Sequence, residues 1–298
     1  MAEALLRELR RVLPALEARE GEPLRNYTSF GIGGPAELLL LPSSGEELAA
    51  LCALLRSLGV KPLLLGNGSN VLAPDEGVKG AVIVTRRAQE TARQGEKLVA
   101  ACGAGLTKLA SFAAEEGLTG LEFAYGIPGT LGGALIMNAG AYGGEMKDVT
   151  AAVTYLDGEL RQRSAAGEAL DFRYRHSRFG PEDVILRAEL QLRAGDREAI
   201  RARCRELTEK RKASQPLEWP SAGSAFKRPR DGYAAALIDQ AGLKGYAVGG
   251  AQVSEKHAGF VVNRGGATAS DVKKLLEDVQ KTVLDRSGVL LEPEIKIL

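Results

Sequence analysis

The sequence predicts an α+β protein of more than one domain, and two stretches carry most of this prediction. An apolar strand over 37–41, a helix over 46–58 and a short strand over 62–65 form a β-α-β succession, which implies a parallel strand pair with a right-handed crossover. Apolar and polar residues alternate along 184–192, as in a half-buried strand. A chain of 298 residues exceeds one comfortable core, so two or three domains are expected, with a break near 195–215.

Local patterns place the remaining elements. Leucines set among alternating acids and bases predict an amphipathic helix over 1–19. Ser43 or Ser44 can cap the helix at 46–58, and Gly59 can end it. The other expected helices are 106–116, 196–213, 234–240 and 270–287. The other expected strands are 81–84, 98–102, 151–156, 169–172, 259–262 and 290–298.

Composition is that of a folded protein from a reducing compartment. Hydrophobic residues make up 45% and charged residues 26%, and 39 Lys and Arg balance 38 Asp and Glu. Because the net charge is near zero, nucleic acid is not expected as a partner. The three cysteines fit neither a disulfide framework nor a zinc pattern, which favours the cytoplasm. The N-terminus does not resemble a signal peptide, and no membrane, metal or obligate protein partner is indicated.

The most informative stretch is Phe123–Gly144, which reads FAYGIPGTLGGALIMNAGAYGG and carries no charge. Its seven glycines suggest backbone that lies close to something large, because glycine is retained where φ is positive or a Cβ does not fit. Pro128 interrupts the stretch, which excludes a long helix or a membrane span. We expect this glycine-rich stretch to be the wall of a cofactor site.

A second glycine-containing loop, Gly66-Asn67-Gly68-Ser69-Asn70, follows directly on a predicted strand. Its N–H groups can turn inward as an anion nest that suits a pyrophosphate, although an isolated pair of glycines is more often a tight turn. Asparagine is scarce in this chain, and a residue type that is nearly excluded should remain where alanine would not serve. The five asparagines are Asn26, Asn67, Asn70, Asn138 and Asn263.

Other nucleotide and hydrolase motifs are rejected. The GIGGPA of 31–36 matches G-x-G-x-x-A, but a strand follows it instead of a helix, so a Rossmann site is not expected. The P-loop motif is missing from the sequence. The two histidines, His176 and His257, lie far apart and form no H-E-x-x-H, which excludes that class of zinc hydrolase.

Three further segments hold candidate catalytic side chains. Arg175 lies between aromatics in FRYRHSRF and suits a carboxylate or phosphate, whereas a solvated basic turn is the plain alternative. Ser224 lies in SAGSAFK, without the G-x-S-x-G context of a hydrolase, and could simply belong to a surface loop. Glu294 follows Pro293 in a predicted edge strand, where it is either exposed or directed into a cleft.

Together these segments resemble the MurB family, the UDP-N-acetylenolpyruvoylglucosamine reductases. The resemblance runs from Asn26 to Leu298 and is carried by seven segments in family order. They are NYTSFGIGGPA, LGNGSN, IPGTLGGALIMNAGAYGGE, YRHS at 174–177, GSAFK at 223–227, AQVSEKHAGFVVN and LEPEI. The short stretch after Arg178 resembles the shorter, second type of the family. Arg228 stands where other members carry asparagine, so its contacts are an open question.

The resemblance implies a two-lobed FAD-binding domain of the vanillyl-alcohol-oxidase (PCMH) type and a smaller C-terminal substrate-binding α/β domain. The lobes would be 1–80 and 81–195, and the substrate domain 196–298, with the last strand, about 289–298, able to return to the FAD-binding part. The implied activity is NADPH-dependent reduction of UDP-GlcNAc-enolpyruvate to UDP-MurNAc through bound FAD, in peptidoglycan precursor synthesis.

The family's catalytic arginine, serine and glutamate fall on Arg175, Ser224 and Glu294. Hydride from reduced flavin would reach C3, Arg175 and a protonated Glu294 would hold the charge that develops on the carboxylate, and Ser224 would protonate C2. The residues implied in FAD binding are Gly66, Asn67, Gly68, Ser69, Asn70, Ile127, Pro128, Gly129, Thr130, Gly132, Gly133, Asn138, Gly140, Ala141 and Tyr142. The residues implied in binding substrate or NADPH are Lys227, His257, Asn263 and Lys296.

Some alternatives stay open at this point. His257 is equally well explained as a structural histidine, and Tyr142 as a core aromatic. An FAD-dependent oxidase or dehydrogenase of the same fold is a second interpretation of the whole chain, although the glycine-rich stretch lacks a histidine for covalent flavin attachment. A non-catalytic nucleotide-sugar binder is a third, but it would have no need of a proton donor.

Overall fold

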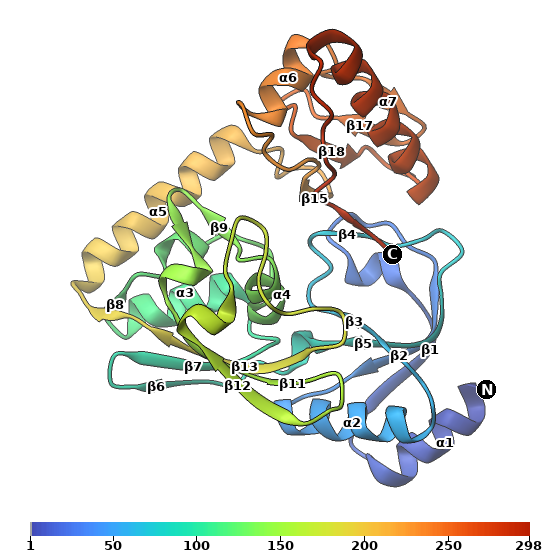
Figure 1. The fold of residues 1–298 in the computed structure, drawn as a ribbon, viewed down its shortest axis with the longest axis vertical. Coiled ribbons are helices and arrows are strands. Elements are labelled where there is room, and N and C mark those ends of the chain that lie inside the picture. Colours follow the sequence, from blue (N-terminus) through green and yellow to red (C-terminus); the bar gives the residue numbers. More distant parts are fainter. Residues whose placement is uncertain (1) are drawn as a thin grey trace. The chain divides into compact units, whose positions relative to one another are not determined.

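The computed structural model describes residues 2–298, so Met1 of the predicted N-terminal helix lies outside it. The chain forms two compact units, each built from several segments (Figure 1). The N-terminal unit comprises the residues up to Glu20, Leu38–Asn67 and Gly80–Lys210, and the C-terminal unit comprises Gly21–Glu37, Gly68–Lys79 and Arg211–Leu298. The boundary at 210–211 falls within the predicted break at 195–215. The assignment of 1–80, 81–195 and 196–298 as functional domains stays a prediction.

Helices are distributed along the chain among a larger number of mostly short strands. The helices are α1 (Ala2–Val12), α2 (Gly45–Ser57), α3 (Leu106–Glu115), α4 (Leu131–Ile136), α5 (Arg197–Ser214), α6 (Ala234–Gln240) and α7 (Ala269–Ser287). The strands are β1 (Glu17–Pro23), β2 (Pro35–Leu41), β3 (Leu63–Leu65), β4 (Val71–Leu72), β5 (Val78–Val84), β6 (Thr91–Gln94), β7 (Lys97–Ala101), β8 (Leu118–Thr119), β9 (Gly140–Ala141), β10 (Gly144–Glu145), β11 (Thr150–Leu156), β12 (Gln162–Ala166), β13 (Val184–Gln191), β14 (Arg193–Ala194), β15 (Ser221–Ser224), β16 (Ala247–Val248), β17 (Ala251–Val253), β18 (Phe260–Asn263) and β19 (Lys296–Ile297).

The N-terminal unit is built on an antiparallel sheet with the strand order β12-β11-β13-β7-β6. The central strand β13 alternates buried and exposed side chains along most of its length, as its sequence predicts. Helices α2 and α4 both contact β13, and in the view of Figure 1 they lie below and above the sheet. Leucines of α1 and α2 join the same hydrophobic core, which includes Leu9 and Leu51.

A second sheet has the order β1-β2-β5-β3 and corrects one prediction. The β-α-β succession of β2, α2 and β3 implied that β2 and β3 pair directly, but β5 lies between them. Strand β3 pairs in parallel with β5, where Leu64 faces Ile83. The buried run Ala81–Val84 of β5 fills this central position, and nothing in the local sequence of β2 or β3 announces it.

Three further predictions are wrong, and two of them have a local cause in a proline. The helix expected over 1–19 ends at Val12, because Pro14 disfavours helical backbone at the residue before it, and β1 follows. The strand expected over 169–172 is a 3-10 helix over Gly167–Leu170. The strand expected over 290–298 shrinks to β19, because Pro293 supplies no N–H to a sheet.

The predicted helices over 46–58, 106–116, 196–213, 234–240 and 270–287 are confirmed to within a residue at each end. Helix α2 begins as expected at a serine cap, where Ser44 Oγ accepts the N–H of Glu47 at 3.1 Å. Helix α7 begins with a capping box in which Thr268 and Asp271 satisfy each other's backbone N–H groups. Gly288 ends α7 in the left-handed conformation, with φ of 71°.

The C-terminal unit has its own hydrophobic core around the sheet β15-β18-β17-β16 and the helices α6 and α7. Helix α7 contacts β16, β17 and α6, and its buried face includes Leu275 and Val279. Phe30 and Leu72, from earlier in the chain, complete this core. The last strand, β19, pairs in parallel with β4, where Lys296 faces Val71, so the C-terminus does return to an N-terminal segment.

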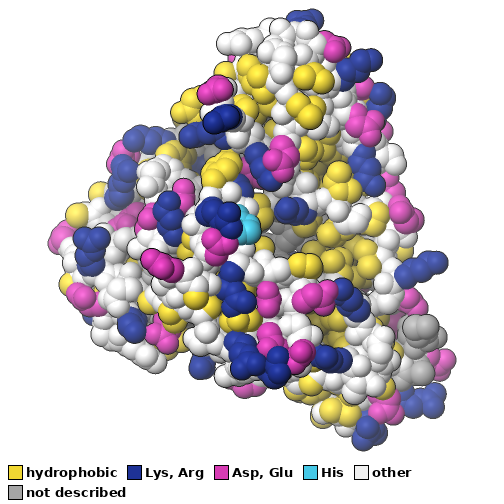
Figure 2. Space-filling view, in the orientation of Figure 1, with side chains coloured by type: hydrophobic (Ala, Val, Ile, Leu, Met, Phe, Trp, Pro, Cys, Tyr) yellow, Lys and Arg dark blue, Asp and Glu magenta, His cyan; other side chains and the backbone are white. Residues whose placement is uncertain are grey.

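The surface is mixed in charge. On the face drawn in Figure 2, basic and acidic side chains are interspersed, in keeping with the near-equal numbers of 39 and 38. Within residues 2–298, none of the helices is both long enough and apolar enough to cross a lipid bilayer.

Candidate active site

A cavity of about 420 Å³ opens in the N-terminal unit. The predicted cofactor-binding residues Asn67, Ile127, Pro128 and Gly129 line it, together with the first turn of α3. Asn67 Nδ2 donates to the Pro128 carbonyl at 3.0 Å, which ties the loop after β3 to the glycine-rich stretch. The structure therefore brings two of the segments singled out by their sequences to the same cavity.

Backbone hydrogen bonds fix this part of the glycine-rich stretch against residues 102–106. Leu106 N donates to the Gly129 carbonyl at 3.0 Å, and Leu131 N donates to the Ala104 carbonyl at 2.8 Å. Gly105, which also lines the cavity, faces open space, since a Cβ built there would meet no atom within 4 Å. The cavity is thus bordered by backbone that a ligand can approach closely.

Basic side chains add a positive lining that the sequence analysis missed. Arg86, Arg87 and Lys108 line the cavity. Arg87 is ion-paired with Glu17, and Lys108 Nζ donates to Gln89 at 2.9 Å. Exposed backbone together with guanidinium and ammonium groups suits an anionic ligand such as a diphosphate. The only signals in the sequence were two arginines directly after β5 and a lysine in the first turn of α3, and neither belongs to a motif.

Several glycines of the predicted site are required by the chain itself. A Cβ on Gly66 would lie 2.2 Å from Thr130 Oγ1, and one on Gly140 would lie 2.6 Å from the Gly144 carbonyl oxygen. Gly68, at φ of 57°, would clash with the Tyr27 carbonyl at 2.2 Å. At these positions the large neighbour inferred from the glycines is the protein's own chain. Their contact with a cofactor stays a prediction.

The segment that carries Arg175 is a tight turn, which we call the arginine turn (residues 173–176). Arg173 and His176 exchange both backbone hydrogen bonds, at 3.0 and 3.1 Å, and Arg175 has a left-handed φ of 53°. The guanidinium of Arg175 lies over the Tyr174 ring, 5.0 Å from its centroid. An aromatic neighbour in the sequence thus contacts the Arg175 side chain.

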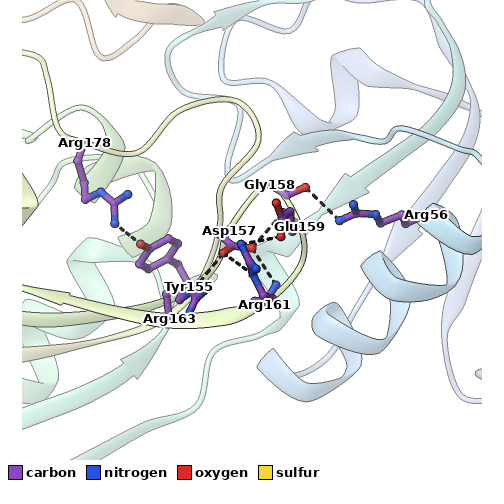
Figure 3. Close-up of polar contacts among 8 residues, drawn as sticks. All are labelled: Arg56, Tyr155, Asp157, Gly158, Glu159, Arg161, Arg163 and Arg178. Atoms are coloured by element: carbon purple, nitrogen blue, oxygen red, sulfur yellow. Dashed lines mark hydrogen bonds and ion pairs between the residues drawn. The ribbon is translucent and has the colours of Figure 1, made fainter.

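The two arginines that flank Arg175 in sequence interact with protein side chains. Arg173 Nη2 donates to Asp171 at 2.5 Å, and the same carboxylate contacts His176 Nε2 at 3.1 Å. Hydrogen bonds from Arg173 and His176 hold the pKa of Asp171 below its usual value. Arg178 donates to the Tyr155 hydroxyl and lies over that ring at 4.8 Å (Figure 3). The choice of Arg175 as the substrate-binding arginine stays a prediction.

Figure 3 also shows what holds Tyr155 in place. Its strand, β11, leads into a tight turn in which Asp157 accepts from the backbone N–H groups of Glu159 and Arg161, at 3.0 and 2.9 Å. The side chain of Arg163 donates to the same carboxylate at 3.1 Å. These hydrogen bonds, led by the one from the Arg161 backbone, keep the pKa of Asp157 low. The turn is a structural support for β11.

In the C-terminal unit, the structure places Ser224 and Glu294 on neighbouring segments. Glu294 N donates to the carbonyl of Ala225, the residue after Ser224, at 2.9 Å. The carbonyl of Glu294 accepts from Asn70 Nδ2 at 3.2 Å, and Lys296 N donates to the Asn70 carbonyl at 2.9 Å. Glu294 is 8% exposed, so it points into the protein and is not a solvated edge residue. A predicted acid and a predicted proton donor thus lie next to a predicted cofactor-binding residue.

The predicted substrate-binding residues differ in their exposure and in the contacts that they make. Lys227 is ion-paired with Glu292, and Lys296 is exposed. Burial lowers the pKa of His257, whose Nδ1 accepts the Gly259 N–H at 3.1 Å and whose ring packs edge-on against Phe260. These contacts give His257 a structural role.

Two further residues of the C-terminal unit, Asn263 and Arg228, make contacts within the protein. Asn263 is 8% exposed and bonds to the Phe30 carbonyl and to the N–H groups of Gly265 and Ala267. Arg228, whose contacts the sequence left open, lies over the Tyr233 ring at 4.4 Å.

Tyr142 is 39% exposed and has a left-handed φ of 53°, so it is not a core aromatic. The contact of Asn263 with substrate or NADPH and that of Tyr142 with FAD stay predictions.

The class of the protein follows from the fold and the cavity. Residues 36–160 match the family model for the FAD binding domain, a range that holds the 66–70 loop and the glycine-rich stretch. A cavity bordered by glycine backbone, Arg86 and Lys108 fits the diphosphate of such a cofactor. The chain is therefore an FAD-dependent oxidoreductase, and the predicted fold class, an FAD-binding domain plus a smaller C-terminal domain, is confirmed.

Similarity to proteins with known names then identifies the family. Residues 215–298 match the family model for the C-terminal domain of UDP-N-acetylenolpyruvoylglucosamine reductase. A protein of that name from Caldanaerobacter subterraneus is 46% identical over 299 residues, which cover 100% of this chain and 99% of the relative. A protein of the same name from Heliobacterium modesticaldum is 46% identical, and the match covers 93% of this chain and 89% of that relative.

A solved structure agrees with these relatives. The crystal structure of UDP-N-acetylenolpyruvylglucosamine reductase (MurB) from Thermus caldophilus matches with a TM-score of 0.80 at 38% identity, covering 95% of this chain and 98% of that one. The chain belongs to the MurB family of UDP-N-acetylenolpyruvoylglucosamine reductases. The resemblance inferred from the seven segments is thereby confirmed.

Proposed function

We propose that this protein uses NADPH and bound FAD to reduce UDP-GlcNAc-enolpyruvate to UDP-MurNAc, a step of peptidoglycan precursor synthesis. The observation that carries the proposal is that the chain segments of Ser224 and Glu294 lie side by side, joined by the Ala225–Glu294 backbone bond of 2.9 Å. The two residues are far apart in the sequence, and a protein that only binds a nucleotide sugar has no use for a proton donor beside a buried acid.

Each residue is assigned one task. FAD, when bound, supplies the hydride to C3 of the enolpyruvyl group. Arg175 holds the substrate carboxylate, where negative charge accumulates, because a guanidinium binds a carboxylate with two parallel hydrogen bonds. A protonated Glu294 donates a hydrogen bond to the same developing charge, and preorganised donors of this kind contribute about 3–4 kcal/mol each. Ser224 delivers the proton to C2, where the enolate is a strong base.

The cofactor-binding part of the proposal uses the cavity of the N-terminal unit. Asn67, Gly129 and the basic residues Arg86 and Lys108 would hold the diphosphate of FAD. An oxidase of the same fold is less well supported, because the glycine-rich stretch carries no histidine for a covalent flavin link.

The test separates the two half-reactions. The purified protein should be yellow, its flavin should bleach anaerobically with NADPH, and the colour should return when UDP-GlcNAc-enolpyruvate is added. Ser224→Ala should leave bleaching unchanged and slow the return of colour by about 10²–10⁴-fold, the contribution of a positioned general acid. Bleaching without recovery in the wild type would point to an oxidase, and equal slowing of both steps in Ser224→Ala would show that Ser224 is misassigned.

A further inference from the structure

Asn138, near the end of the glycine-rich stretch, has an unusual combination of burial and backbone conformation. Its side chain is 1% exposed, and its φ is 41°. A left-handed φ is uncommon in residues other than glycine, although asparagine tolerates it better than most. A buried amide in this conformation needs full hydrogen bonding, because each unpaired polar group would destabilise the fold.

The amide of Asn138 meets that need by joining three segments of the N-terminal unit. Its Nδ2 donates to Glu145 Oε2 at 2.8 Å and to the Arg173 carbonyl at 3.1 Å. Its Oδ1 accepts the backbone N–H of Lys147 at 2.9 Å. An asparagine side chain has two N–H donors on one nitrogen, and here both are given to the protein. Little donor capacity is left for FAD.

The bond to Arg173 is made at the base of the arginine turn. The Arg173 carbonyl accepts from Asn138 and also from the His176 N–H, which closes the turn at 3.1 Å. Arg175 sits inside this turn at φ of 53°, a conformation that is unfavourable for a residue with a Cβ. Such a conformation persists only where neighbouring contacts hold it. Asn138 supplies one of those contacts.

We propose that Asn138 is a positioning residue for Arg175: its amide anchors the arginine turn to the glycine-rich stretch and thereby fixes where the guanidinium points. This inference rests on the proposed function, in which Arg175 holds the substrate carboxylate. It gives Asn138 a task other than the direct FAD contact predicted from the sequence. The task is specific to an amide, because an aspartate of the same shape has no N–H to donate.

Glu145 determines how the test is designed. Its carboxylate accepts from Asn138 and forms an ion pair with Lys147 at 3.0 Å. Burial, which raises the pKa of Glu145, is outweighed by the hydrogen bonds from Lys147 and Asn138 and by the charge of Arg175, so the pKa is lowered. Asn138→Asp alone would therefore place two carboxylates together near Arg175 and confuse charge with the loss of a donor.

The swapped variant Asn138→Asp/Glu145→Gln avoids this problem. It keeps the net charge of the cluster and lets the new amide at 145 donate to the new carboxylate at 138. The donor to the Arg173 carbonyl is still lost. We expect amide hydrogen exchange over 173–178 to accelerate, and flavin oxidation by UDP-GlcNAc-enolpyruvate to slow about 100-fold, the effect of a misplacement of about 1 Å. Flavin reduction by NADPH and the Kd for FAD should stay within about threefold of wild type.

Asn26→Asp is the matched control. Asn26 also donates an amide N–H to a glutamate, Glu22, at 3.3 Å, but on the exposed surface of the C-terminal unit. It should change neither half-reaction nor the exchange over 173–178. The proposal is overturned if the swapped variant exchanges and turns over like wild type, or if FAD binding and NADPH-driven reduction weaken as much as substrate-driven oxidation does. Should the wild type itself fail to oxidise with this substrate, the proposed function fails, and the exchange measurement still decides whether Asn138 anchors the turn.

Discussion

Truncation of Asn263 separates a structural role from a role in substrate binding. The side chain is 8% exposed, and its amide makes three hydrogen bonds to backbone groups, at 3.1 Å to the Phe30 carbonyl and at 2.9 and 3.2 Å to the N–H groups of Gly265 and Ala267. Asn263→Ala removes all three. At about 1 kcal/mol of net stabilisation for each bond, the variant should lose about 3 kcal/mol of unfolding free energy.

The loss should be visible by calorimetry and by urea titration. For a chain of this size, about 3 kcal/mol corresponds to a fall in Tm of about 5–10 °C. Well below that temperature, the KM for UDP-GlcNAc-enolpyruvate should match that of the wild type, because the bonds of Asn263 connect parts of the protein. Asn26→Ala, which removes an exposed amide, should change the unfolding free energy by less than about 0.5 kcal/mol. The reasoning is refuted if Asn263→Ala is as stable as that control while its KM for substrate rises.

Two further predictions concern the cavity and His257. Lys108→Gln removes an exposed positive charge from the cavity lining. The Kd for FAD should therefore rise about two- to fivefold at low salt and less at high salt. A fluorescence titration that shows no change in Kd would argue against a diphosphate in the cavity. Burial lowers the pKa of His257 in the folded state. Just below a pH of about 6.5, His257 is therefore protonated in the unfolded chain and still neutral in the folded protein. Stability should therefore fall as pH drops from about 6.5 through the lowered pKa, and urea midpoints should show that His257→Gln loses less over this range than the wild type.

Helices were predictable where their ends are marked in the local sequence. Ser44 marks the start of α2, and Gly288 ends α7. The exception is α1, which ends at Val12, two residues before Pro14. Pro14 is a stop signal in the sequence, but the spacing of the leucines predicted a helix that continues beyond it. The backbone hydrogen bonds of a helix are made within its own segment, and its end signals are local, so its sequence contains much of what decides its length.

Strand pairing was harder to predict because a strand is completed by a partner elsewhere in the chain. The sequence of β3 gives no sign that its neighbour is β5 and not β2, since both candidates are apolar. The same limit applies to the cavity. Arg86 and Lys108 line it because β5 and α3 bring them there, and an isolated arginine or lysine carries no motif that could predict this.

The scarcity of asparagine was informative, because four of the five asparagines hydrogen-bond to backbone carbonyls in other parts of the chain. Asn67 donates to the Pro128 carbonyl, Asn70 to that of Glu294, Asn138 to that of Arg173 and Asn263 to that of Phe30. In each case the amide holds a backbone carbonyl of a loop or terminal segment that regular secondary structure leaves without a ladder partner. A short side chain that both donates and accepts is suited to this task, and alanine is not. Four of the five asparagines therefore mark loops and terminal segments that are fixed by side-chain hydrogen bonds, and the catalytic and binding roles of these segments stay predictions.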